Sequence, residues 1–240
     1  MSMLIPIRDL NPHKRFPVVT VSIIALNVFA ALYTNSLLSL DTVKAFQYGA
    51  VPCDVVGRCP TSDPLFNALL ESRPAFLSLF TSMFMHAGIL HLGFNMLFLW
   101  VFGNNVEDRL GRIRFTLFYL AAGLAAAFAQ LLPNADSTVP LVGASGAVSG
   151  VLGAYIVLWP RATIVSILPL GFFFTTIRTP AWVALGLWFA LQLFSGLGQV
   201  GDRGVAYLAH IGGFVAGFVL IFVLGGFRRP PEPASDAWSG

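Results

Sequence analysis

Ser145 lies between glycines, in Gly143-Ala144-Ser145-Gly146, at the start of an apolar segment that continues to Trp159. A serine hydroxyl is a weak nucleophile until a base within hydrogen-bonding reach removes its proton, and histidine titrates in a suitable range for that step. His210 stands near the start of the last apolar segment of the chain. The two residues could therefore form a Ser-His dyad that attacks a carbonyl group.

Attack on a carbonyl also requires donors for the oxyanion that develops. His91 and Asn95 begin an earlier apolar segment, and residues four apart share one face of a helix. The Asn95 amide, the His91 imidazole and the Ser145 backbone N–H are the candidate donors. Taken singly, a membrane serine usually bonds to its own helix, and a membrane histidine packs or relays protons. The joint placement of these residues favours catalysis.

Two better-known serine hydrolase arrangements do not fit. No acidic residue falls inside the expected apolar helices, so a Ser-His-Asp triad is not expected. The α/β-hydrolase pattern G-x-S-x-G is also absent, because Ala147 stands in place of its last glycine.

The composition places these residues in a membrane. The chain of 240 residues is 56% hydrophobic and only 10% charged, and its mean hydropathy is +0.77. Since one span needs roughly 20 apolar residues, the length allows about six spans with short loops. The net charge of +3 does not indicate nucleic acid as a partner, because the basic residues stand at the ends of spans.

The predicted architecture is all-α: one membrane domain over 16–225, between a cytoplasmic segment, 1–15, and a disordered cytoplasmic tail, 226–240. The first apolar run resembles a signal peptide, but its length and the spans that follow favour an uncleaved helix. Residues 103–111 are predicted to be a tight polar turn, and 163–177 an interfacial or re-entrant connection. The six expected spans cover about 16–33, 87–102, 112–132, 143–159, 180–196 and 204–225.

Charge bias orients these spans. With a cytoplasmic N-terminus, inner segments hold ten of the 14 basic residues, as the positive-inside rule requires. The second, fourth and sixth spans then begin at the outer face. At ~1.5 Å per residue, His91, Ser145 and His210 lie at a similar depth, within roughly 10 Å of the outer boundary. The sequence thus predicts a multi-pass protein of the cell membrane with both termini cytoplasmic.

A long loop, 35–84, contains both cysteines of the chain, Cys53 and Cys59. Two cysteines without nearby histidines make a poor metal site. Free thiols and a small disulfide both remain open for this pair.

The glycines near the candidate dyad predict close helix packing. Gly146 and Gly150 are four apart on one segment, and Gly213 and Gly217 are four apart on another. Small residues at this spacing allow the backbones of membrane helices to approach closely.

Together these features closely resemble the rhomboid family of intramembrane serine proteases. The resemblance runs from about residue 77 to 225 and departs from the family pattern at two points. Ser149 replaces an aromatic residue that often follows the nucleophile, and Leu77-Ser78 stands where a Trp-Arg pair is often found. The matching motifs are His86-x4-His91-x3-Asn95, Glu107-x3-Gly111, Gly143-x-Ser145-Gly146 and Ala209-His210-x2-Gly213-x3-Gly217.

The resemblance implies a six-helix bundle with a Ser145–His210 dyad. It also implies an oxyanion hole formed by His91, Asn95 and the Ser145 N–H. The expected activity is hydrolysis of peptide bonds in or beside the transmembrane helices of membrane-protein substrates, without a metal or cofactor.

Two other classes of function compete with the protease. A transporter would predict inverted repeats or acidic residues inside spans, and neither is found. A catalytically silent rhomboid-like binding protein would predict loss of the serine or the histidine, and both Ser145 and His210 are present.

Overall fold

The computed structural model describes residues 5–39, 41–59, 64–71, 74–170, 173–198 and 206–225. It has a helical bundle, a group of short helices and a small antiparallel sheet. Short 3₁₀ turns cover Ser82–Phe84 and Leu132–Asn134. The helices are α1 (Val18–Tyr33), α2 (Thr42–Tyr48), α3 (Pro52–Val55), α4 (Pro64–Glu71), α5 (Ala75–Thr81), α6 (Ile89–Leu110), α7 (Arg112–Leu131), α8 (Ser145–Leu158), α9 (Ala181–Gly198) and α10 (Tyr207–Val223), and the strands are β1 (Ile5–Asp9), β2 (Thr163–Leu170) and β3 (Phe173–Pro180).

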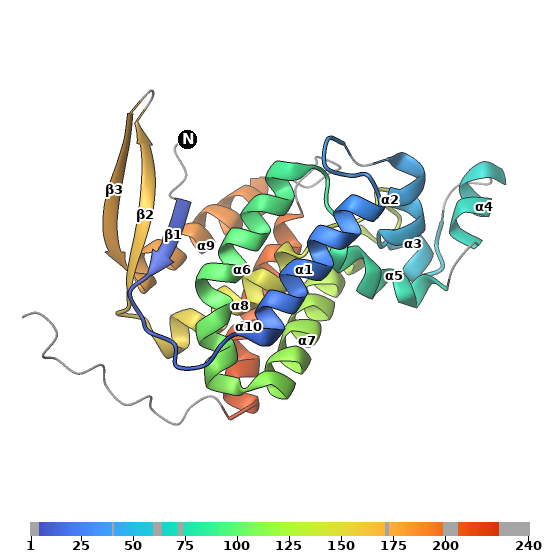
Figure 1. Cartoon of the computed structure of the whole chain (residues 1–240). Coiled ribbons are helices and arrows are strands. Elements are labelled where there is room, and N and C mark those ends of the chain that lie inside the picture. The colour runs from blue at the N-terminus through green and yellow to red at the C-terminus, as the bar shows by residue number, and fades with distance from the viewer. Residues whose placement is uncertain are drawn as a thin grey trace, which may run out of the picture.

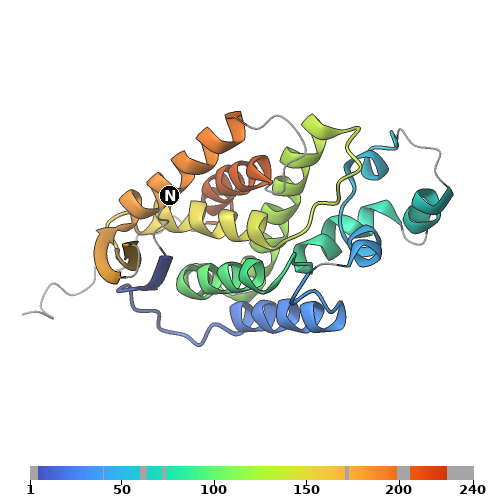
Figure 2. The same ribbon diagram turned by 90° about the horizontal axis from the view of Figure 1, so that it is seen from above.

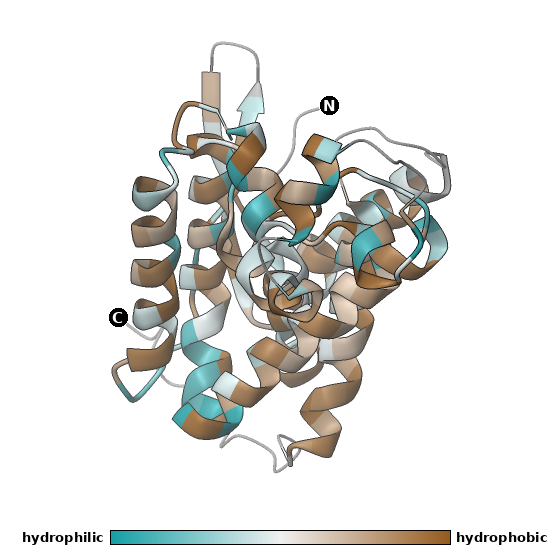
Figure 3. Ribbon diagram, turned by 90° about the vertical axis from the view of Figure 1, so that its right-hand side faces the viewer, coloured by the Kyte–Doolittle hydropathy of each residue, from teal (hydrophilic) through white to brown (hydrophobic). Residues whose placement is uncertain are grey.

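The long helices form the body of the molecule, with α8 near its centre. The sheet lies at one end of this bundle and α2 to α5 lie at the other, as both Figure 1 and Figure 2 show. Apolar residues dominate the long helices, including surfaces that face away from the core (Figure 3). In the described part of the chain, α6 and the segment 112–134 are long and apolar enough to cross a membrane, and five shorter apolar helices accompany them.

Residues 103–111 do not form the predicted turn. The helix α6 continues to Leu110, and the chain turns at Gly111, where φ is 77°. The physical reason is that Asn104, Asn105 and Glu107, at this end of α6, are buried and hydrogen-bonded. The carboxylate of Glu107, 3% exposed, accepts hydrogen bonds from the Val19 and Thr20 backbone N–H groups at 2.9 and 2.7 Å. Since the first N–H groups of a helix lack internal partners, Glu107 caps α1.

Residues 163–180 form a β-hairpin, which the sequence analysis did not anticipate. The strands β2 and β3 pair antiparallel, with Val165 opposite Arg178. The strand β1, from the N-terminal segment, pairs antiparallel with β2 to give the order β1-β2-β3. Threonine, isoleucine and valine favour strands, and Pro169 is tolerated near the end of the hairpin where β2 is connected to β3, opposite Phe174. The N-terminal segment is thus part of the fold.

Asp9, the last residue of β1, ties the sheet to the bundle. Its Oδ2 accepts hydrogen bonds from Asn105 Nδ2 of α6 at 2.7 Å and from the Tyr155 hydroxyl of α8 at 2.5 Å. Burial raises the pKa of the Asp9 carboxyl from its ordinary value of 3.8 to about 6, although the Tyr155 hydrogen bond opposes the shift. The folded protein therefore binds a proton at Asp9 more tightly than the unfolded chain does.

This difference predicts a pH dependence of stability. Between about pH 4 and pH 6 the folded protein retains the Asp9 proton and the unfolded chain does not, so stability falls as pH rises through this window and levels off above it. We expect Asp9→Asn, which stays neutral, to flatten this part of the curve. Thermal unfolding in detergent from pH 4 to 8, compared between the parent and the variant, isolates the residue. The same dependence of stability on pH in the parent and in Asp9→Asn would contradict the raised pKa of Asp9.

The helices α8 and α10 pack at backbone contact. A Cβ built on Gly213 would lie 2.0 Å from the Gly146 carbonyl oxygen, and one on Gly217 would lie 1.9 Å from the Gly150 carbonyl oxygen. Both distances are far below any contact that a side chain tolerates. The two glycine pairs predicted from the sequence are therefore the contact points of these helices.

Cys53 and Cys59 are joined by a disulfide, which settles the alternative that the sequence left open. Cys53 is fully buried, in a small apolar cluster with Val51 and Leu70. This cluster connects α3 to α4, and the disulfide closes a short loop that begins in α3 and ends at Cys59. The predicted disordered tail, 226–240, lies outside the described residues.

Candidate active site

Ser145 is the first residue of α8 and follows a sharp bend at Gly143. The φ of Gly143 is 128°, a conformation that a residue with a side chain rarely adopts. A Cβ on Gly143 would also lie 2.9 Å from Cε1 and 3.0 Å from Nε2 of His91. The bend thus brings the His91 ring against the main chain beside Ser145. The positive end of the α8 dipole lies at the serine.

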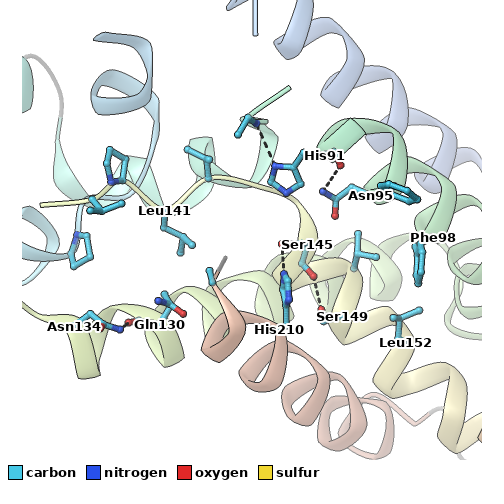
Figure 4. Close-up of a pocket in the computed structure, with 18 of the residues that line it drawn as sticks. His91, Asn95, Phe98, Gln130, Asn134, Leu141, Ser145, Ser149, Leu152 and His210 are labelled. Carbon is cyan, nitrogen blue, oxygen red and sulfur yellow. Dashed lines mark hydrogen bonds between the residues drawn. The ribbon is translucent and has the colours of Figure 1, made fainter. Parts of the chain in front are cut away.

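His210 lies in the first turn of α10 and faces Ser145 across the close α8–α10 contact. Its Nε2 is 2.8 Å from Ser145 Oγ, a hydrogen-bonding distance. Figure 4 shows these two side chains pointing toward each other from different helices. They are 65 residues apart in the chain, so the helix packing alone brings them together.

The pair borders a cavity of about 490 Å³. Apolar side chains form much of the wall, and the polar groups converge around Ser145 (Figure 4). This combination is typical of a substrate site. The residues that line the cavity include His91, Asn95, Phe98, Leu141, Ser149, Leu152 and Trp188.

The hydrogen bond at one ring nitrogen of His91 determines whether the other nitrogen carries a hydrogen. The backbone N–H of Ala87 donates to His91 Nδ1 at 3.3 Å, so Nδ1 is the acceptor nitrogen of a neutral ring and Nε2 carries the hydrogen. That Nε2 lies on the side of Gly143. His86, fully buried, supports the ring from behind, with the two ring centroids 5.2 Å apart. His91 can therefore present a donor next to Ser145.

Asn95 is buried and lines the same cavity. Its Nδ2 donates to the carbonyl oxygen of His91 at 2.9 Å. An amide nitrogen has two hydrogens, so this bond fixes the side chain and uses one of them. The Ser149 hydroxyl does not bond to His210 but donates to the Ser145 carbonyl at 2.6 Å.

The structure adds two contacts that the sequence analysis missed. Gln192 of α9 lies with Oε1 2.7 Å from Nδ1 of His210. Gln130 of α7 accepts a hydrogen bond from the Ala209 N–H at 3.3 Å, which caps the first turn of the helix that carries His210. A polar side chain in an apolar segment was the available signal in both cases.

Comparison with known proteins assigns the chain to a family. The rhomboid domain matches residues 73–227 of the chain, more than half of its length. The chain belongs to the rhomboid family. It is therefore a helical, multi-pass membrane protein, as the composition predicted.

Several rhomboid relatives are similar over the same region. Rhomboid protease GluP of Bacillus subtilis (strain 168) is 36% identical over 149 residues, which are 61% of this chain and 26% of that protein. Rhomboid protein 1, mitochondrial, of Saccharomyces cerevisiae is 32% identical, over 59% of this chain and 40% of the relative. Rhomboid-like protein 11, chloroplastic, of Arabidopsis thaliana is 31% identical, over 66% and 56%. The matched regions thus span between about a quarter and just over half of these relatives.

Proposed function

We propose that this rhomboid is an intramembrane serine endopeptidase. Its activity would be the hydrolysis of peptide bonds in or beside the transmembrane helices of membrane-protein substrates. The observation that carries the proposal is the 2.8 Å contact between Ser145 Oγ and His210 Nε2 at the edge of a cavity. Family membership and the similarity to a named protease support it.

In this mechanism Ser145 Oγ attacks the scissile carbonyl carbon while its proton passes to Nε2 of His210. The carbonyl oxygen becomes an oxyanion, for which the Nε2–H of His91, the Asn95 amide and the Ser145 backbone N–H are donors. His210 then gives the proton to the leaving amine, and an acyl-enzyme on Ser145 remains. Water, activated by His210, hydrolyses the ester and restores the serine.

The substrate must expose its scissile bond. Within an intact helix each carbonyl oxygen is hydrogen-bonded, and breaking such bonds is costly in lipid. A bond beside a helix end or at a weak point of the helix is therefore the expected target. The apolar wall of the cavity suits an unwound segment of a membrane protein.

The silent binding protein is the main alternative. A binding protein would not require a nucleophile, a base and oriented donors to meet at one point, as Ser145, His210 and His91 do. The transporter alternative is weaker, because the two acidic residues of α6 do not line this cavity. Glu107 accepts a hydrogen bond from the Val19 N–H, and Asp108 accepts one from the Lys14 N–H.

The proposal is tested by cleavage of a transmembrane reporter in proteoliposomes that contain the purified full chain. We expect two products from the parent and none from Ser145→Ala, with mass spectrometry locating the cut in or next to the reporter helix. Equal amounts of product from both proteins would exclude Ser145 as the nucleophile.

Asn95→Ala separates oxyanion binding from the dyad. Loss of one oxyanion donor typically lowers kcat by roughly 10² to 10³, so the variant is expected to remain measurably active while Ser145→Ala is not. The comparison requires kcat from reporter cleavage and equal thermal stability of the two variants. An unchanged kcat in Asn95→Ala would remove the oxyanion role of this residue alone.

We also propose that both termini are cytoplasmic and that the protein resides in a cell membrane. The ten-to-four division of basic residues supports this orientation. A reporter protein that is active only in the cytoplasm should be active when it is fused to either end of the chain. An external terminus would contradict the arrangement.

A further inference from the structure

Contacts from α9 support His210 on the side away from Ser145. Gln192 Oε1 lies 2.7 Å from His210 Nδ1, and the Trp188 ring lies with its centroid 6.0 Å from that of His210. Trp188 and Gln192 are four residues apart, so they lie on one face of α9. That face holds the imidazole by a ring contact and a hydrogen bond.

The chemistry of this hydrogen bond fixes the proton on the imidazole. An amide oxygen can only accept, so Nδ1 must carry the hydrogen and donate it to Gln192. In a neutral imidazole the other nitrogen, Nε2, then has a free lone pair. Nε2 is the atom that faces Ser145 Oγ. The contact with Gln192 thus selects the tautomer that can accept the serine proton.

Among the described residues, the other groups near His210 do not duplicate this role. The Ser149 hydroxyl is bonded to the Ser145 carbonyl oxygen. Tyr207, one turn earlier on α10, meets His210 edge to face, with ring centroids 6.5 Å apart. The hydrogen bond that orients the imidazole therefore comes from α9.

We propose that Gln192 is a positioning residue for this rhomboid: it holds His210 in the tautomer that accepts the Ser145 proton and stabilises the imidazolium that forms. The inference deepens the proposed function and rests on it. Loss of the outer partner that orients a metal-bound histidine typically costs about 10- to 100-fold in activity, and we expect an effect of similar size here. The proposed role also makes the ability of His210 to accept the proton depend on the position of α9.

The test uses the purified full chain in proteoliposomes. Gln192→Met keeps the length of the side chain and removes the acceptor, Gln192→Glu keeps an acceptor oxygen, and Leu193→Met is the control at an exposed neighbouring position. We expect Gln192→Met to lower kcat about 10- to 100-fold with little change in KM. Gln192→Glu should recover most of the loss, and Leu193→Met should match the parent.

A small fluorophosphonate provides a readout that does not depend on the binding of a substrate helix. Its rate of reaction with Ser145 should fall in Gln192→Met by a factor similar to the fall in kcat, at unchanged thermal stability. A raised KM with normal kcat and labelling would instead assign Gln192 to substrate contact and overturn the proposal. So would a Gln192→Met variant that labels at the parent rate.

The two proposals fail in different ways. If Ser145→Ala and His210→Ala still cleave the reporter, the proposed function itself is wrong. If those two variants are inactive and Gln192→Met retains full activity, only the positioning role is wrong.

Discussion

Replacing either Ser145 or His210 with alanine is expected to abolish turnover, and replacing both should cost little more than replacing one. The reason is that in the proposed mechanism the two side chains act as a single chemical unit, joined by the 2.8 Å contact between Oγ and Nε2. Without the base the hydroxyl is not activated, and without the hydroxyl the base has no nucleophile to activate. Each single loss should therefore lower kcat by at least about 10⁴-fold.

The measurement is kcat for reporter cleavage by the parent, both single variants and the double variant. Independent contributions would multiply, so a double variant far slower than either single variant would contradict a shared unit. Fluorophosphonate labelling is the second readout and should be lost completely in Ser145→Ala. Thermal denaturation must show that each variant is folded before its rate is compared.

The meeting of Ser145 and His210 could be predicted because it depends on regular quantities. Helical rise is constant and the charge bias predicts the orientation of the spans, so residues near the starts of the expected fourth and sixth spans are predicted to lie at the same depth. Glycines four apart then indicate which helix faces touch, and Gly213 and Gly146 do so. The sequence pattern was thus sufficient to predict the close approach of α8 and α10.

The remaining features depend on partners far away in the sequence. The end of α6 looked like a turn because it is polar, but Glu107 is stabilised there by the N-terminus of α1, 87 residues earlier. The hairpin of β2 and β3 is extended by β1, across more than 150 residues. Gln192 looks like any polar residue in an apolar helix until the rotation of α9 is known. None of these long-range contacts can be predicted from the local composition of the sequence.

Gly217→Ala is expected to destabilise the bundle strongly, whereas Gly186→Ala is not. A Cβ on Gly217 would lie 1.9 Å from the Gly150 carbonyl oxygen, and one on Gly186 would have nothing within 4 Å. Backbone cannot rotate aside as a flexible side chain can, so α10 must move away from α8. Overpacking of this kind typically costs about 1–3 kcal/mol, and a backbone collision belongs at or above the top of that range.

Gly186→Ala is the matched control, because it makes the same change in a helix where the added methyl group is unopposed. It should be neutral or should stabilise by roughly 0.5–1 kcal/mol, since alanine favours a helix over glycine. Thermal unfolding of both variants in the same detergent gives the comparison. Equal midpoints would contradict the backbone contact between α8 and α10.

The Gly217 variant should also lose activity faster than it loses structure. The contact between Ser145 and His210 joins the same two helices near their starts. A displacement of α10 that accommodates the methyl group would therefore increase the distance from His210 Nε2 to Ser145 Oγ. At a temperature where Gly217→Ala is still folded, its fluorophosphonate labelling should be slower than that of Gly186→Ala. Normal labelling in a destabilised Gly217→Ala would show that only the part of α10 after His210 is displaced. It would also show that the contact of His210 with Gln192 of α9 is enough to keep His210 next to Ser145.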